Sequence, residues 1–351
     1  MNEADSEVKA AGNAQEGAER APSNGVLLAA VGAVWMIAML WSARATITSR
    51  ADAEMEVTST AYAMPGAVSA SLVAGAAVAL AVLALVTRSG RARSVTVRFV
   101  IATGTGLAIG ALGALSIITI NTEGWLYAVV GGTVAAAATI GGALGGLRYP
   151  RVTAAACWGA VAVFVVGFVL SYVQDALLPV LGSGDTAESQ AGAAGWFTLV
   201  QSVIGGLAGA VVAYRVLRRA RRRSGGADVG WPLYALAGAG PGLLLVAGEV
   251  LTRTAGSRVL ELAGKVSELE LTVQQMLSVS RLNSALIVTF VGAFTAIIAV
   301  GRTMGTAAEA DDATAAPEDD PAAPGAVGDP DEIERAARAD EPQTVPSGKD
   351  D

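Results

Sequence analysis

The sequence contains no histidine and only one cysteine among its 351 residues. The absence of histidine removes the most common general base, proton carrier and zinc ligand of proteins. The one cysteine, Cys157, has no second cysteine in the chain with which to form a disulfide. We also find no paired carboxylates on one helix face, no metal-ligand spacing and no phosphate-binding glycine loop with a lysine. The sequence therefore predicts no catalytic residue, no metal and no cofactor, and a protein that is not an enzyme.

Charged residues are also scarce, at 16% of the chain, whereas 53% of the residues are hydrophobic and the mean hydropathy is +0.51. The charges cluster at the two ends and in short segments that separate long apolar runs. Soluble domains have a larger charged share, so this distribution is typical of a chain embedded in a lipid bilayer. The predicted fold class is all-α, a polytopic bundle of transmembrane helices.

Eight apolar runs are each long enough to cross roughly 30 Å of hydrocarbon at about 1.5 Å per residue. We interpret the first run as an uncleaved helix, because the residues before it are more acidic than basic, unlike a secretory signal. The expected spans are 25–42, 65–87, 99–120, 125–147, 152–173, 196–214, 232–252 and 284–301.

The positive charges between these spans predict the orientation of the chain. With the N-terminus in the cytoplasm, the inner segments from the first span to Arg302 hold 13 Lys or Arg and the outer segments hold six. Inner loops of membrane proteins are enriched in Lys and Arg. We therefore expect a multi-pass protein of the plasma (inner) membrane with both ends in the cytoplasm.

Both ends of the chain are polar and flank a membrane domain over 25–302. Residues 1–24 have no apolar periodicity, and residues 303–351 contain 14 Asp or Glu with recurring prolines. Such segments bury too little apolar surface to fold alone, so we expect two disordered cytoplasmic tails. The acidic tail is either simply solvated or a docking segment for a basic partner.

Glu249 is the one acidic residue that falls inside an expected span. A charge in the membrane is costly and is often retained for function. Glu249 either pairs with Arg253, one helical turn later near the end of the span, or forms a proton or cation site.

The same span contains the run Ala237-Gly-Ala-Gly-Pro-Gly242. Pro241 removes a backbone hydrogen bond and glycines such as Gly240 weaken the helix. The run predicts either a kink or close-packing surface, or a broken helix that binds a substrate as in many transporters. Glu249, Pro241 and Gly240 are therefore the candidate substrate-site residues.

An outer segment over 257–279 has apolar residues at alternating spacings of three and four, the pattern of a heptad seam. We expect an amphipathic helix there, which either lies on the bilayer or its own bundle, or binds a protein partner or a second copy. The candidate partner-binding residues are Val259, Leu262, Val266, Leu269, Val273 and Met276.

Two further patterns concern packing and lipids. Glycines four residues apart predict close helix contacts inside the bundle. The basic run Arg215–Arg223 at the inner end of the sixth span predicts contact with anionic lipid headgroups, and binding to nucleic acid is not expected. The glycine pairs are Gly106 and Gly110, Gly141 and Gly145, Gly142 and Gly146, and Gly205 and Gly209.

The stretches AGAGPGLLLVAGEVLTR (237–253) and SRLNSALIVTFVGAFTAIIAVGRT (280–303) resemble uncharacterised multi-pass membrane proteins of actinobacteria. This resemblance covers about a fifth of the chain and implies no particular activity. From the residues, we expect a non-enzymatic scaffold or partner-binding protein of the cell envelope. The alternative is a transporter or lipid-handling protein that uses the span with Pro241 and Glu249.

Overall fold

The structure is a computed structural model that describes residues 3–48, 53–88, 94–120, 125–223, 230–266 and 268–314. The regular elements of these residues are all α-helices. They are α1 (Glu3–Thr48), α2 (Ala53–Arg88), α3 (Val95–Ile118), α4 (Trp125–Gly145), α5 (Pro150–Tyr172), α6 (Gln174–Leu177), α7 (Ala187–Arg223), α8 (Trp231–Thr254), α9 (Ser257–Val266) and α10 (Glu268–Thr314).

Eight of these helices are long and apolar enough to cross a membrane, which confirms the predicted fold class and number of spans. The candidate spans are 25–48, 56–88, 95–118, 125–145, 150–172, 187–223, 231–254 and 269–302. Large apolar side chains are exposed along them, including Trp41, Phe168 and Phe294. Apolar side chains on the outer surface of the bundle are suited to contact with the hydrocarbon tails of a bilayer.

The helices at both ends extend further than the sequence predicts. Helix α1 begins at Glu3, so the N-terminal segment expected to be disordered is helical from that residue on. Alanine and glutamate favour helix, and extending an existing helix is easier than starting one. Helix α10 likewise continues to Thr314. Residues 305–314 belong to a second unit of the chain, and the rest of the acidic tail, 315–351, lies outside the described residues.

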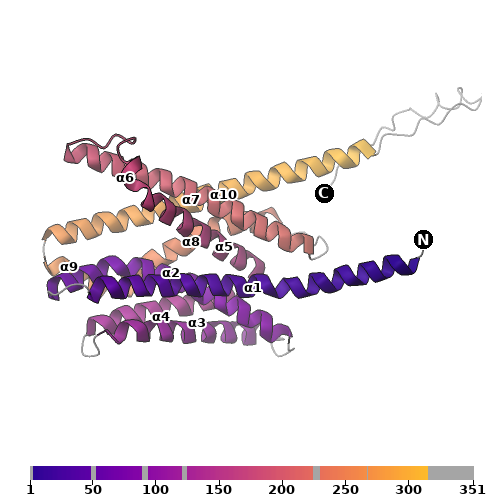
Figure 1. Ribbon diagram of the computed structural model, residues 1–351, viewed down its shortest axis with the longest axis horizontal. Helices are drawn as coiled ribbons and strands as arrows, with labels where there is room; N and C mark the ends of the chain where they lie inside the picture. The colour runs from indigo at the N-terminus through magenta and orange to yellow at the C-terminus, as the bar shows by residue number, and fades with distance from the viewer. Residues whose placement is uncertain are drawn as a thin grey trace, which may run out of the picture. The chain divides into compact units, whose positions relative to one another are not determined.

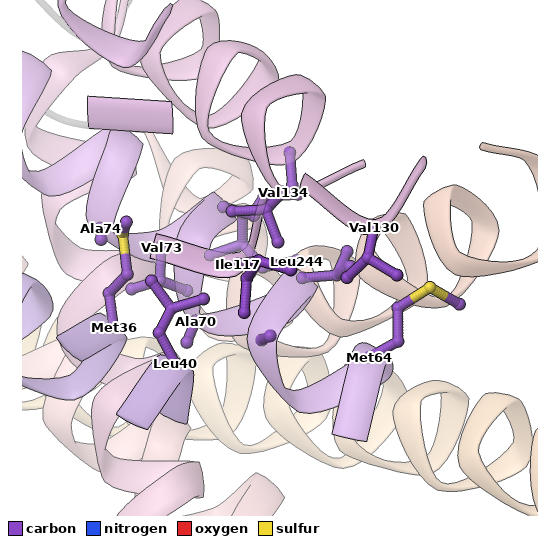
Figure 2. Close-up of a cluster of buried hydrophobic side chains, with 14 of the residues drawn as sticks. Met36, Leu40, Met64, Ala70, Val73, Ala74, Ile117, Val130, Val134 and Leu244 are labelled. Carbon is purple, nitrogen blue, oxygen red and sulfur yellow. The ribbon is translucent and has the colours of Figure 1, made fainter. Parts of the chain in front are cut away.

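Helices α1 to α4 lie side by side, and α2 contacts each of the other three (Figure 1). Their shared core also receives α8. Figure 2 shows Met36 and Leu40 of α1 beside Val73 of α2, with Ile117 of α3 and Leu244 of α8 in the same cluster. All five side chains are buried. This core joins the first four helices to the second half of the chain.

Glycines allow the backbones of these helices to approach closely, as their spacing predicts. A Cβ atom added at Gly141 would overlap the carbonyl of Leu72 in α2, whereas one added at Gly142 would lie against Gly106 in α3. Gly141 and Gly142 of α4 therefore face two different neighbouring helices. Gly209 of α7 has the same role toward Gly159 of α5.

Helices α5, α7 and α8 form a second group, and in Figure 1 α5 and α7 run obliquely to α1–α4. Helix α8 is one continuous α-helix through Pro241, so the break considered for this span is absent. A proline removes only one backbone hydrogen bond, and the bundle leaves room for its ring. A Cβ atom added at Gly159 of α5 would lie 2.5 Å from Cγ of Pro241. The proline packs where the neighbouring helix has no side chain.

Candidate ligand site within the helical bundle

Glu249 lies near the end of α8 and its side chain is only 4% exposed. Its carboxylate accepts three hydrogen bonds. Arg253 Nε donates to Oε1 at 3.1 Å, Ser278 Oγ donates to the same oxygen at 2.7 Å, and Arg281 Nε donates to Oε2 at 3.1 Å. A buried charge is tolerated when it is paired and hydrogen-bonded, and both conditions are met here.

Close packing of α8 on α10 brings these groups together. Cβ atoms added at Gly238 and Gly242 of α8 would overlap Gly292 and Thr289 of α10, so the two backbones nearly touch. Such contacts are typical of small residues between membrane helices. Further along the same pair of helices, Arg253 Nη2 donates to the carbonyl oxygen of Ser278 at 2.7 Å. The arginine therefore ties α8 to α10 beside the carboxylate.

A cavity of about 510 Å³ lies next to this ion cluster and is lined by Glu249 and Arg281. Six helices contribute to its wall, namely α1, α2, α5, α7, α8 and α10. Its volume lies within the range of small-molecule sites, roughly 300–1,000 Å³. Sites between the helices of a bundle are a common location for such ligands.

One side of the cavity is aromatic and apolar. Trp35 of α1 stacks on Phe164 of α5, with ring centroids 5.1 Å apart and an interplanar angle of 24°. Met39 and Phe168 extend this wall. The lining also includes polar groups, among them Gln201 of α7, whose Nε2 donates to the carbonyl oxygen of Gly167 at 3.2 Å. The lining of the cavity thus combines apolar and polar side chains.

Two buried nitrogen atoms of the cavity-lining residues have no hydrogen-bond partner within the described part of the chain. They are Nε1 of Trp35 and Nη2 of Arg281. Both atoms are donors only. Buried donors without an acceptor are rare in proteins, and each calls for an acceptor from water or a ligand. An acceptor oxygen of a molecule bound in the cavity would satisfy them.

A groove of about 620 Å³ between α7 and α10 adjoins the cavity. The two share Thr198, Ser280 and Ser284 as lining residues. The outer wall of the groove includes Met276 and Val279, whose exposed fractions are 69% and 63%. Such exposed apolar side chains on a membrane helix fit contact with lipid tails. The groove is a candidate path between the bilayer and the cavity.

The three predicted substrate-site residues do not lie together. Glu249 lines the cavity. Gly240 and Pro241 are buried at the packing surface of α8, where Gly240 faces Ala156 of α5 and Pro241 packs against Gly159. Of the alternatives that the sequence left open for the glycine–proline run, these contacts match close packing.

The predicted seam over 257–279 is divided between two helices. Helix α9 ends at Val266 and α10 begins at Glu268, running without interruption into the last span. Val259 is fully buried in the core and Leu262 is partly buried against it, whereas Leu269 is 73% exposed. Met276 is exposed and belongs to the groove, Val273 is half-buried, and Val266 falls among side chains that the structure does not describe.

Sequence reasoning missed Arg281, Trp35 and Phe164. Arg281 was expected in an outer loop, but it lies in α10, within the candidate span 269–302. Arg281 could have been predicted, because a single acidic residue in a span needs a cationic partner and few Lys or Arg residues lie near Glu249 in the sequence. No comparable signal marks Trp35 or Phe164, whose contact depends on which helix faces meet.

Comparison with protein-family models, with curated proteins and with solved structures finds no match for this chain. Its function must therefore be argued from the chemistry of the site.

Proposed function

We propose that this protein is a lipid-handling membrane protein that binds an amphipathic molecule in the cavity beside Glu249. The observation that carries the proposal is a cavity lined by the stacked rings of Trp35 and Phe164, in which Nε1 of Trp35 and Nη2 of Arg281 are buried donors without an acceptor among the described residues. In the proposal, the protein lies in the plasma membrane with both ends in the cytoplasm.

The head of the ligand meets Arg281 and Trp35. Nε of Arg281 is occupied by Glu249, which holds the guanidinium in place and leaves Nη2 as a donor. A guanidinium donor suits phosphate and carboxylate oxygens, and charge-assisted hydrogen bonds are stronger than neutral ones. We therefore assign the polar group of the ligand to the class of phosphate or carboxylate.

The apolar part of the ligand packs on Phe164, Phe168 and Met39. The groove that shares Thr198, Ser280 and Ser284 with the cavity favours exchange with the bilayer. An acyl chain satisfies both features, because it can extend from the aromatic wall of the cavity into the groove.

This proposal follows the alternative that the sequence left open, in preference to an envelope scaffold. The scaffold hypothesis was based on the heptad segment over 257–279, together with the charged tails and the missing catalytic groups. Val259 is buried in the chain's own core while Leu269 and Met276 are exposed, so these residues do not offer one common face to a partner.

The test uses a lysophosphatidic acid with a diazirine on its acyl chain, crosslinked by light to the full chain in proteoliposomes. Crosslinks located by mass spectrometry are expected on cavity-lining segments of α5 and α10. Ser284→Phe places a ring where groove and cavity meet and is expected to reduce labelling at least about fivefold. Trp35→Phe keeps an aromatic ring but removes the donor, a loss of about 1 kcal/mol or roughly fivefold in affinity.

Leu286→Phe is the matched control, because Leu286 is an exposed residue of the same helix that lines neither the cavity nor the groove. This variant should be labelled like the natural chain. Labelling confined to residues that line neither the cavity nor the groove, or labelling that Ser284→Phe leaves unchanged, would overturn the proposal.

A further inference from the structure

A second groove, of about 660 Å³, lies at the other end of the bundle, between α1, α2, α5 and α7. It is separate from the cavity beside Glu249, since the two share no lining residue. Three arginines line it, Arg151 of α5 with Arg219 and Arg223 of α7. Arg151 is the second residue of α5 and Arg223 the last of α7, so these antiparallel helices bring their basic ends together.

The groove changes from basic to apolar along both helices. On α7, Val212, Val216, Arg219 and Arg223 follow one another at spacings of four, three and four, which places them in one stripe. On α5, Arg151 is followed by Ala154 and Trp158 at spacings of three and four. Each helix thus carries cations at its end and apolar groups one to three turns deeper in the bundle.

The three guanidinium groups are available for an anion. Arg151, Arg219 and Arg223 are exposed and form no ion pair with any residue that the structure describes. Other arginines of the same run point elsewhere, as Arg218 does, whose guanidinium lies 5.9 Å from the ring centroid of Tyr214. The basic run therefore divides into residues inside and outside the groove.

We infer that this groove is a binding site for an anionic glycerophospholipid. The phosphate group contacts Arg151, Arg219 and Arg223, and an acyl chain runs along Val216, Trp158 and Leu28 toward Leu80 of α2. Three converging cations match an anionic headgroup, and the apolar continuation matches the chain attached to it. Basic pockets between membrane helices are known locations for such headgroups. The inference does not depend on the proposed function of the cavity.

The test measures binding of phosphatidylglycerol to the full chain by native mass spectrometry from detergent, with phosphatidylcholine and inorganic phosphate as the other two probes. The natural chain is expected to bind phosphatidylglycerol in preference to phosphatidylcholine. Replacing the groove arginines together, as Arg151→Gln, Arg219→Gln and Arg223→Gln, is expected to weaken binding about a hundredfold, since each cation contributes about fivefold.

The matched control is the triple variant Arg148→Gln, Arg215→Gln and Arg222→Gln, which removes the same charge from neighbouring positions that do not line the groove. Its affinity for phosphatidylglycerol should lie within about threefold of that of the natural chain, since its groove arginines are intact.

Ala154→Trp keeps all three groove arginines but fills the apolar path, and it should also abolish preferential binding of phosphatidylglycerol. An equal loss in both triple variants would mean diffuse attraction to the surface and overturn the inference. Suppose that inorganic phosphate displaces phosphatidylglycerol completely and that Ala154→Trp still binds the lipid preferentially. This result would indicate a site for phosphate alone and would also overturn the inference.

Discussion

Arg281 Nε lies 3.1 Å from Oε2 of Glu249, although the two residues are 32 positions apart in the chain. The carboxylate is almost completely buried, whereas 31% of the Arg281 side chain and 36% of the Arg253 side chain remain exposed. The free-energy cost of desolvation is therefore larger for Glu249 than for either arginine. Loss of a cationic partner should be more harmful than loss of the whole pair.

The first prediction follows from this asymmetry. Arg281→Met should lower the free energy of unfolding by about 3 kcal/mol, because it leaves a buried carboxylate with one cation fewer. The double variant Glu249→Leu with Arg281→Met should recover at least half of that loss, because Arg253 keeps its bond to the Ser278 carbonyl and reaches the surface. Reversible unfolding in mixed micelles measures both. A double variant as unstable as the single one would contradict the argument.

The second prediction concerns the contact of α4 with α2. Gly141→Ala should destabilise the bundle by about 1–3 kcal/mol, because the added Cβ atom overlaps the backbone of Leu72 and the helices must separate. Gly132→Ala in the same helix is the control, since its Cβ atom would have no neighbour within 4 Å. Alanine favours helix over glycine by about 1 kcal/mol, so the control should be neutral or slightly stabilising. Melting temperatures in detergent compare the two, and equal effects would count against close backbone contact.

The number of spans was predictable from the sequence, whereas the arrangement of the site was not. Length and hydropathy determine which segments cross a bilayer, and these properties are local. The pair of Glu249 with Arg253 was also predictable, because residues four apart share a helix face. The contact of Glu249 with Arg281 depends on which faces of α8 and α10 meet, and the small residues that decide this, such as Gly242 and Gly292, occur on many faces.

The seam over 257–279 failed as a single helix for a related reason. Spacing alone does not state whether an apolar stripe faces a partner, lipid or the chain's own core. Val259 is buried in the core, whereas Leu269 lies in the first turn of α10, which is continuous with the last span. Periodicity identified the helical character of the segment but not where one helix ends and the next begins.

The third prediction uses Cys157, the single cysteine of the chain, which is fully buried in α5. A maleimide reagent should not label the folded protein in mild detergent and should label it completely after denaturation. The transition followed by labelling should coincide with the loss of helical signal in circular dichroism. Rapid labelling of the folded protein would show that the packing of α5 against α2 and α8 is looser than the structure has it.

The fourth prediction tests the orientation inferred from the positive charges. In a Cys157→Ala background, Asp185→Cys lies in the exposed segment before α7 and Ser94→Cys lies at the exposed start of α3. With the N-terminus in the cytoplasm, a membrane-impermeant maleimide added to intact cells should label Asp185→Cys alone. Permeabilised cells should show both labelled, which controls for reactivity. Labelling of Ser94→Cys alone would invert the orientation and place the arginine groove in the outer leaflet. Labelling of both sites in intact cells would place the two segments on the same side of the membrane, which would refute the number of spans predicted between them.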